Sequence, residues 1–244
     1  MVVPVFNEGT LLTDTLPTIH AFLEGYHAET ELLISDDGSG GATRAILRAF
    51  ALAHTTGKTG VRLLIPPIHR GKGAAVRDGL LAATGEVAGF LDADLQLPVV
   101  QVLRLLQALE SQSADVAIAS RRIPGARMIG GFEKRDRGFF GRALNRLVRA
   151  LFVPGIHDTQ CGLKLMRRAT VAPLVSRCFI PGFLFDVELL ARAHRAGRRI
   201  VEVPIEWGFR GQSTVRLLRH GPPALLDLLR LKLAFLWEDI KSSH

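Results

Sequence analysis

The chain has 244 residues, 48% of them hydrophobic, so a full core is affordable and a disordered chain is excluded. Lys and Arg outnumber Asp and Glu by 31 to 23, and this net charge of +8 favours an anionic partner: a phosphorylated molecule, a membrane surface or a nucleic acid. Two cysteines, Cys161 and Cys178, make no disulfide framework, which indicates a reducing, cytosolic setting, and no apolar run reaches the ~18 residues of a membrane span.

Apolar runs and helix-like segments alternate along the chain. The runs that predict strands are Val2–Val5, Leu32–Ser35, Val61–Ile65, Val87–Leu91, Val116–Ala119 and Ile200–Ile205. Helix-like segments lie near residues 11–24, 42–54, 73–83 and 99–110. The alternation predicts an α/β fold, a Rossmann-like and mostly parallel sheet with helices on both faces. We expect one domain, residues 1–220, followed by a C-terminal helical extension, residues 221–244.

Polar residues follow several of the predicted strands, where ligands bind in open α/β sheets. The strand ends read "PVFNE", "SDDGSG", "DADLQ" and "SRR". Each end taken alone is equally typical of an ordinary turn. Two phosphate-binding motifs are excluded, because a P-loop would need Gly where Leu52 stands and a dinucleotide fingerprint would need Gly or Ala where Thr43 stands. Two acids in "DDGSG" would repel a pyrophosphate, so this turn suits hydrogen bonding to a base or ribose.

The segment "DADLQ" is typical of a metal site. Alternate residues of an extended chain point the same way, so Asp92, Asp94 and Gln96 could present three oxygen donors to one point beyond the strand. Mg²⁺ and Mn²⁺ prefer such ligands and accept substrate phosphates and waters as the others. The alternative is an N-cap for the helix that starts near Pro98.

Taken in order, the motifs resemble those of the inverting family 2 glycosyltransferases of GT-A fold. The resemblance is carried over roughly residues 2–220 by "VVPVFNE", "ISDDGSGG", "HRGKGAAVRDGLLAATGEVAGFLDADLQ", "ASRR", "HDTQCGLKLMRR" and "GFLFDVELLARAHRAGRRIVEVPIEW". "DTQCGLK" and "FDVELL" resemble the dolichyl-phosphate glucosyltransferase branch more than the mannosyl branch. The resemblance implies metal-dependent transfer of glucose from UDP-glucose to a polyprenyl or dolichyl phosphate, with inversion. The alternatives are another donor, GDP-mannose or UDP-GlcNAc, or a soluble acceptor.

The same resemblance implies roles for individual residues. The nucleotide pocket would contain Pro4, Asn7, Glu8, Asp36, Asp37, Arg70, Lys72 and Asp92. The metal, Mg²⁺ or Mn²⁺, would lie on Asp92, Asp94 and Gln96. The catalytic residues would be Asp94, Asp186, Glu188 and the phosphate-binding Arg121 and Arg137. The sugar and acceptor would meet Asp158, Thr159, Gln160 and Lys164. Whether Asp186 or Glu188 acts as a base or only orients the sugar stays open.

Charge and amphipathicity favour a membrane surface as a further partner. Nine Lys or Arg and two acids lie between Arg121 and Arg149. Within this stretch, residues 139–152 place arginines on one helical face and Phe140, Leu144, Leu147 and Leu151 on the other, as in an interfacial helix. We therefore expect a peripheral protein on the cytoplasmic face of a membrane. The alternative is a surface helix packed on the domain. The C-terminal "PPALLDLLRLKLAFLWEDI" could likewise lie on a membrane, pack on a partner or cover the sheet.

Two other function classes are disfavoured. A nucleic-acid binder is also basic, but aromatic residues make up only 7% and none interleaves with the basic residues as a stacking motif. A non-catalytic nucleotide-sugar-binding subunit would not need the metal and phosphate residues, all of which are in the sequence. We therefore expect a nucleotide-sugar donor and a polyprenyl-phosphate acceptor and no nucleic acid. A second copy of the chain or a membrane-spanning partner is left open, since relatives carry membrane-spanning helices and this sequence shows none.

Overall fold

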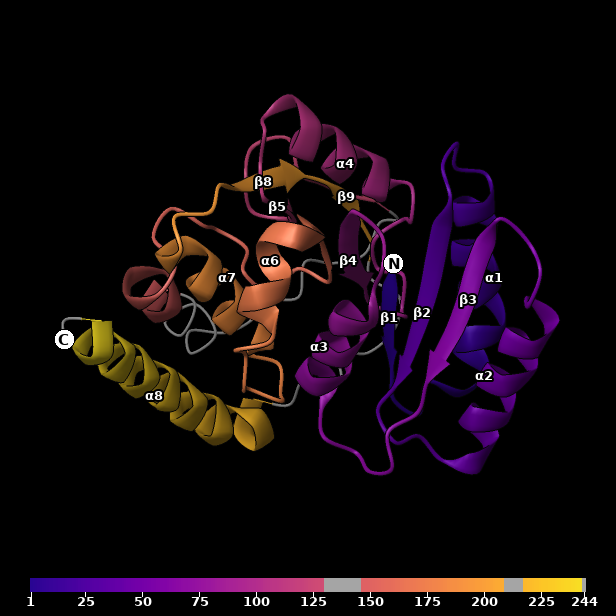
Figure 1. Cartoon of the computed structure of the whole chain (residues 1–244), viewed down its shortest axis with the longest axis horizontal. Helices are drawn as coiled ribbons and strands as arrows, with labels where there is room; N and C mark the ends of the chain where they lie inside the picture. Colours follow the sequence, from indigo (N-terminus) through magenta and orange to yellow (C-terminus); the bar gives the residue numbers. More distant parts are fainter. Residues whose placement is uncertain (130–145, 209–216, 243–244) are drawn as a thin grey trace.

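A seven-stranded sheet forms the centre of the computed structural model, which describes residues 1–129, 146–208 and 217–242. The strand order is β3-β2-β1-β4-β7-β5-β8 (Figure 1). The strands are β1 (Val2–Val5), β2 (Thr30–Asp36), β3 (Thr59–Leu64), β4 (Val87–Leu91), β5 (Val116–Ser120), β7 (Leu163–Arg167) and β8 (Ile200–Pro204). β6 (Arg127–Met128) pairs with β9 (Glu206–Trp207) in a separate ladder. All six predicted strands are therefore present in the predicted mostly parallel sheet.

One strand of the sheet was not predicted. β7 lies between β4 and β5 and is antiparallel to both. Its sequence, "LKLMR", is short and carries Lys164 at its second position, which reads as a solvent-facing residue. Lys164 is instead fully buried and pairs with Phe90 across the ladder. The insertion separates the ends of β4 and β5 by one strand and brings the loop before β7 between them.

Helices cover both faces of the sheet, as predicted (Figure 1). They are the 3-10 turn η1 (Gly9–Leu11), α1 (Leu12–Glu24), α2 (Gly41–Ala53), α3 (Lys72–Ala82), α4 (Gln101–Ser111), α6 (Arg168–Val175), α7 (Phe185–Arg195) and α8 (Leu217–Ser242). Residues of α1, α2 and α4 pack into one core layer, and residues of α3, α6, α7 and α8 pack into the other. Alternating strand residues supply both layers, because successive side chains point to opposite faces: Val2 and Phe90 face one layer, Val3 and Leu91 the other.

The C-terminal helix α8 packs against the domain through one side only. Leu228, Leu231 and Phe235 are buried in the core layer of α7, and the Phe235 ring lies 6.3 Å from that of Phe152. Residues 146–151 form the helix that precedes Phe152; the rest of the predicted interfacial helix, residues 139–145, lies outside the described residues. The predicted boundary between residues 220 and 221 falls inside α8. Within the described part of the chain, no helix combines the length and the apolar character that a membrane crossing needs.

Candidate functional site

The polar strand ends meet at one edge of the sheet. A cavity of about 60 Å³ lies beyond the end of β4. Its polar lining comes from the segment after β4, from the residue after β5 and from the loop before β7: Asp92, Asp94, Gln96, Arg121 and Gln160. This is the edge where the sequence predicted the ligand site.

Asp92 begins the segment that follows β4 and forms an ion pair with Lys72, the first residue of α3. Lys72 Nζ donates to Asp92 Oδ2 at 2.9 Å and lies 2.7 Å from Oδ1. Burial alone would lower the pKa of Lys72, but the carboxylates of Asp92, Asp186 and Asp94 together outweigh it and raise the pKa to about 12. A Cβ at Gly162 would lie 2.3 Å from Asp92 Oδ2, so only glycine allows this approach. A fixed cation thus stands beside the first predicted metal ligand.

Asp94 and Gln96 reach the cavity through a turn, which corrects the extended chain assumed from the sequence. The strand ends at Leu91, and Leu95 has a left-handed φ of 45°. Gln96 donates to Asp94 through its backbone N, at 3.2 Å, and through Nε2, at 2.8 Å. Burial raises the pKa of Asp94, and the charge of Asp92 raises it further. The three predicted ligands line one cavity, although the alternation argument for them was wrong.

A third carboxylate adds negative charge here. Glu8 is exposed, but partial desolvation raises the pKa of its carboxyl, and the charges of Asp94 and Asp92 raise it further. Crowded carboxylates of this kind fit a divalent cation, which would remove their repulsion. No group of three or more His, Cys, Asp or Glu in the described residues could hold a metal by itself. The donor set is therefore two carboxylates and an amide, which fits a metal only if substrate oxygens and water complete its shell.

Asp37 holds the loop that leads into α3. Its Oδ1 accepts from the backbone N of Arg70 at 2.8 Å, and its Oδ2 accepts from the backbone N of Gly71 at 2.9 Å. His69 Nδ1 lies 2.9 Å from the same carboxylate. The Arg70 side chain pairs with Asp78 in α3. The carboxylate predicted to meet a base or ribose is thus engaged by the protein itself.

The neighbouring acid, Asp36, has a similar local role. It is fully buried, accepts from the backbone N of Ser39 at 3.0 Å and from Arg44 Nε at 3.1 Å. Asn7, the residue predicted beside it, accepts from the backbone N of Gly40 at 2.8 Å through Oδ1. These contacts fix the loop after β2 against the end of β1, in which Pro4 pairs with Ser35. The structure therefore joins three of the predicted nucleotide residues, Pro4, Asn7 and Asp36, in one framework at the sheet edge.

Arg121 and Asp158 form a two-point ion pair on the other side of the cavity. Arg121 Nε donates to Asp158 Oδ2 at 2.7 Å, and its Nη2 donates to Oδ1 at 2.9 Å. Burial opposes ionisation of Asp158, but Arg121 holds its pKa below the ordinary value. Thr159 is buried next to this pair, and Gln160 is exposed and lines the cavity. The predicted phosphate arginine is therefore positioned by a predicted acceptor-site residue.

Lys164 and Asp186 form a buried ion pair between β7 and α7. Lys164 Nζ donates to Asp186 Oδ1 at 2.5 Å and to the carbonyl of Cys161 at 2.8 Å. Glu188, expected to act with Asp186, points elsewhere and pairs with Arg192 at 3.0 Å. Residues two apart on a helix lie on different faces, so the acidic pair of the sequence is divided between two networks. Arg137 lies outside the described residues.

The structure adds functional candidates that the sequence pattern did not single out. Trp207 lines the cavity, with its ring 6.0 Å from the Arg121 guanidinium. Glu202 accepts from the backbone N of His157 at 2.8 Å and of Asp158 at 3.0 Å, and so fixes the loop before β7. Glu202 alternates with valines in "IVEVP", a pattern that could have marked it as facing a different side from the core. No sequence signal indicated Trp207, because its position depends on the β6–β9 ladder.

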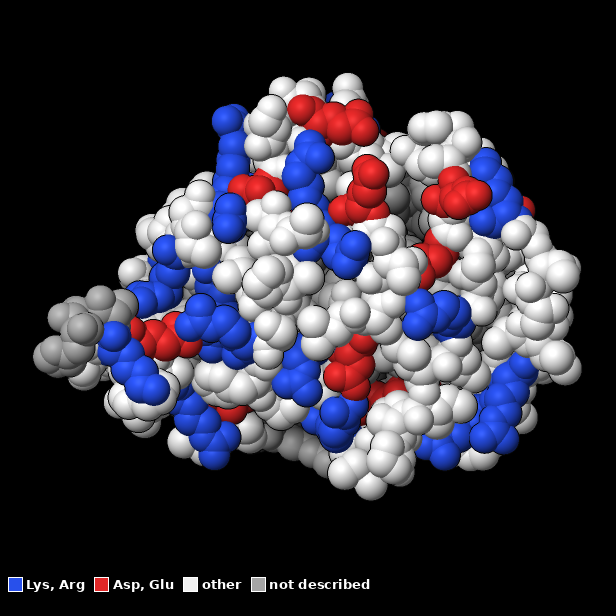
Figure 2. All heavy atoms as spheres, viewed as in Figure 1, with Lys and Arg blue, Asp and Glu red and all other residues white. Residues whose placement is uncertain are grey.

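Basic residues also gather away from the cavity. On the face shown in Figure 2, many Lys and Arg side chains lie over the part of the molecule formed by α6, α7 and α8. Arg177, Arg192 and Arg195 of this region are paired with Glu238 and Asp239 of α8. Three of the arginines that make the sequence basic therefore hold α8 by ion pairs with its acidic residues.

Solved structures of glycosyltransferases share this fold. A mannosyltransferase of Pyrobaculum calidifontis, in complex with GDP-Man and Mn²⁺, superposes with a TM-score of 0.59 at 18% identity, over 87% of this chain and 56% of that one. Glucosyl-3-phosphoglycerate synthase of Mycobacterium tuberculosis, in complex with Mn²⁺, UDP-Glc and glycerol 3-phosphate, gives a TM-score of 0.63 at 21% identity, over 90% and 73%. At these identities the likeness shows the fold, which is GT-A as predicted.

Sequence relatives are more similar. A dolichyl-phosphate beta-glucosyltransferase of Trichomonas vaginalis is 32% identical over 96% of this chain and 70% of its own length. The Saccharomyces cerevisiae enzyme of that name is 31% identical, over 97% and 74%. The sequence profile of glycosyl transferase family 2 matches residues 1–172. The chain therefore belongs to glycosyltransferase family 2 and is a glycosyltransferase.

Proposed function

We propose that this protein transfers glucose from UDP-glucose to a polyprenyl phosphate of the dolichyl-phosphate class, with inversion and with a divalent metal. The observation that carries the proposal is the cavity at the end of β4. There the carboxylates Asp92 and Asp94 line one cavity with the Arg121 guanidinium, and the Lys72 ammonium pairs with Asp92. A metal–diphosphate group, with negative oxygens around a cation, complements this arrangement. The named sugar and acceptor follow the names of the relatives at 31–32% identity.

Asp94, Gln96 and Asp92 would hold the metal, Mg²⁺ or Mn²⁺. Bound there, the cation would neutralise negative charge on the departing nucleoside diphosphate. Lys72 supports the same charge from α3, because its high pKa keeps it protonated at neutral pH. Arg121 is held by Asp158 in one orientation and can present its remaining N–H groups to phosphate oxygens.

The proposed phosphate acceptor makes a catalytic base unnecessary, which bears on the role of Asp186. A phosphate oxygen is already ionised at neutral pH, so the attacking group needs no strong base. Asp186 accepts from Lys164 in a buried pair, a state that suits orienting the sugar rather than removing a proton. Attack on the face of the sugar opposite the leaving diphosphate inverts the anomeric carbon.

Binding measurements test the donor and the metal. Calorimetry with UDP and with GDP, each with Mn²⁺ and with EDTA, should give tighter binding of UDP and a loss of affinity in EDTA. Asp94→Asn should lose the metal-dependent part of the affinity and keep its melting temperature. Tighter binding of GDP would assign a GDP-sugar donor instead, and equal affinity in EDTA would reject the metal.

We further propose that the protein sits peripherally on the cytoplasmic face of a membrane, where a lipid phosphate is accessible. The face of α8 turned away from the core supports this. Seven apolar side chains, each between 45% and 60% exposed, recur at helical spacing: Leu225, Leu226, Leu229, Leu233, Leu236, Trp237 and Ile240. Leu147 and Leu151 of the preceding helix are exposed as well. An apolar stripe bordered by basic residues matches an anionic lipid surface.

Vesicle co-sedimentation across a salt series tests this surface. Binding to anionic vesicles should weaken in high salt and persist, because salt screens the charge contribution and not the apolar one. Leu229→Glu and Leu233→Glu should each lower the partition coefficient roughly tenfold, since each removes about 1.5 kcal/mol of apolar burial. Leu52→Glu, at an exposed leucine of α2, is the matched control and should bind like wild type. Equal partitioning of all four proteins would favour a soluble phosphorylated acceptor. If the exposed face of α8 instead binds a second copy of the chain or another subunit, that protein would replace the lipid surface as the partner.

A further inference from the structure

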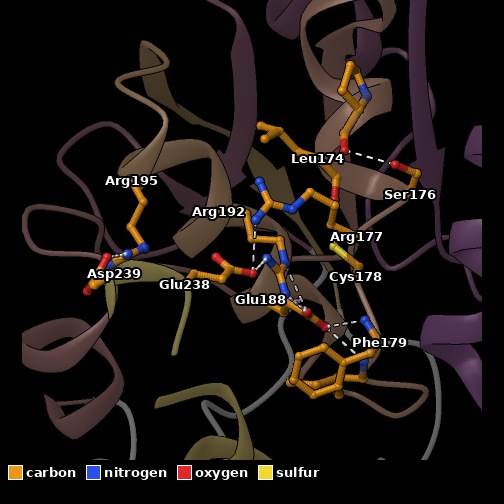
Figure 3. A network of polar contacts seen from close by, with 12 residues as sticks. Leu174, Ser176, Arg177, Cys178, Phe179, Glu188, Arg192, Arg195, Glu238 and Asp239 are labelled. Carbon is orange, nitrogen blue, oxygen red and sulfur yellow. Dashed lines mark hydrogen bonds and ion pairs between the residues drawn. The ribbon is translucent and has the colours of Figure 1, made fainter. Parts of the chain in front are cut away.

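Arg192 of α7 joins two carboxylates in the interior. Its Nε donates to Glu188 Oε1 at 3.0 Å, and its Nη1 donates to Glu238 Oε1 of α8 at 3.0 Å. Figure 3 shows the guanidinium between the two acids, with the Arg195–Asp239 pair to one side. Arg192 and Glu188 are buried, whereas Glu238 is partly exposed. A planar guanidinium can bridge two carboxylates at fixed angles, which a lysine ammonium cannot do in the same way.

The second oxygen of Glu188 holds a backbone segment. Glu188 Oε2 accepts from the backbone N of Phe179 at 3.0 Å and of Ile180 at 2.7 Å. These residues begin the segment 178–184, which connects α6 to α7 and leads directly into Asp186. Both oxygens of Glu188 are therefore engaged, one toward Arg192 and one toward this segment.

The segment 178–184 lies against the start of α3. The backbone N of Ala74 donates to the carbonyl of Pro181 at 3.1 Å, and Arg77 Nη1 donates to the carbonyl of Cys178 at 2.9 Å. A Cβ at Gly73 would lie 2.6 Å from the carbonyl oxygen of Gly182 and 2.8 Å from that of Ile180, so the segment and α3 touch without space between them. α3 begins at Lys72, the cation that pairs with Asp92.

We propose that Arg192 is a positioning residue that couples the seating of α8 to the placement of Lys72 and Asp186 in the active site. The coupling runs from Glu238 through Arg192 and Glu188 to the segment 178–184, and from there to α3 and the first turn of α7. It rests on the proposed function only in assigning Lys72 and Asp186 to the donor site. A change at α8, such as docking on a surface, is transmitted by this chain of contacts.

A positioning role differs from a purely stabilising one because α8 is held by other contacts too. Leu228, Leu231 and Phe235 bury its inner face, and Arg195 pairs with Asp239 at the surface. Loss of Glu238 therefore leaves α8 seated while releasing Arg192 and also Arg177, whose Nη2 lies 3.0 Å from the same Glu238 oxygen. Arg177→Ala removes this second pair alone and should match wild type in exchange of residues 178–184 and in kcat. Asp239 offers a matched control, since it is an acid on the same helix that pairs with a different arginine of α7.

The experiment compares Glu238→Ala, Glu238→Gln and Asp239→Ala as full-length proteins. Amide hydrogen exchange is measured on the peptide covering residues 178–184, and kcat and KM are measured with the nucleotide sugar found to be turned over. Glu238→Ala should speed exchange of this peptide and lower kcat about 3- to 30-fold, the range seen for coupling residues, with KM changed less. Glu238→Gln keeps an acceptor oxygen and should restore most of kcat, and Asp239→Ala should match wild type in both readouts.

The proposal is overturned if Glu238→Ala and Asp239→Ala behave alike, or if Glu238→Ala lowers only the melting temperature. Exchange of residues 178–184 needs no substrate, so it reports on the coupling even if UDP-glucose is not the donor. Faster exchange in Glu238→Ala with unchanged kcat would refute the link to Lys72 and Asp186. Slower turnover with unchanged exchange would refute the route through the segment.

Discussion

Variants of Lys164 and Asp186, made singly and together, should separate the contribution of this ion pair to stability from its contribution to catalysis, and the first of them is Lys164→Met. Lys164 is fully buried, and its ammonium pairs with Asp186, whose side chain is 8% exposed. Methionine keeps the length of the side chain but leaves a buried carboxylate without its cation, and the carbonyl of Cys161 loses a donor as well. Removal of one partner of a buried ion pair costs about 3–5 kcal/mol. A domain is stable by only about 5–15 kcal/mol, so the variant should lose a large share of its free energy of unfolding.

The double variant Lys164→Met/Asp186→Leu removes both charges together. Replacement of a whole buried ion pair by apolar residues of similar size is often neutral, so the double variant should return to within about 1 kcal/mol of wild type. Asp186→Leu alone leaves the ammonium unpaired and should again be destabilised by about 3–5 kcal/mol. All three variants should lack transfer activity, because each loses either Asp186 or the cation that orients it.

Urea denaturation at pH 7 of the four proteins gives the double-mutant cycle. The expected pattern is two unstable single variants and one stable, inactive double variant. A Lys164→Met protein as stable as wild type would show that the pair is not buried as described. A double variant no more stable than the singles would contradict the desolvation argument, and an active one would remove Asp186 from the chemistry.

Three further outcomes follow from the site. Arg121 holds the pKa of Asp158 below its unfolded value of 3.8 despite burial, so the pair stabilises the fold fully above about pH 4 and loses this contribution as pH falls through the native pKa. Asp158→Asn should therefore flatten the acid limb of a plot of unfolding free energy against pH, and an unchanged limb would contradict the pairing. Gly162→Ala should displace the Asp92 carboxylate and abolish turnover while the circular dichroism spectrum is retained. Gly41→Ala, where a Cβ meets nothing within 4 Å, is the control and should be active. An active Gly162→Ala enzyme would refute the close approach of Gly162 to Asp92. Burial raises the pKa of Cys161 to about 12, so iodoacetamide at pH 8 should leave this thiol unmodified until urea is added, and rapid alkylation of the native protein would show that the loop before β7 opens.

The strands, the covering helices and the sheet edge that carries the site could be predicted from the sequence. Continuous apolar runs and the carboxylates after them are local signals, and Asp92 and Asp94 stand directly behind such a run. β7 could not be predicted, because burial of Lys164 depends on Asp186, which comes 22 residues later and is brought close only by the fold. A buried charge whose partner is remote reads in a sequence as a surface residue.

The acidic residues show a second limit. Asp36 and Asp37 were correctly placed at the sheet edge, yet their carboxylates accept hydrogen bonds from the loops around them. Glu188 was grouped with Asp186 by the family resemblance, whereas helical geometry turns it toward Arg192 and the segment 178–184. A motif gives the residue types at a site, and only the three-dimensional contacts tell which of them hold the framework and which remain free for substrate.

The release of UDP from UDP-glucose tests the proposed function most directly. It is measured with Mn²⁺ in the presence and absence of a polyprenyl phosphate, for wild type and for Asp94→Asn. The proposed function predicts rapid release by wild type only when the lipid phosphate is present, loss of this release in excess EDTA, and a severe loss in Asp94→Asn. Release that is equally fast without the lipid phosphate, or that continues in excess EDTA, would contradict it.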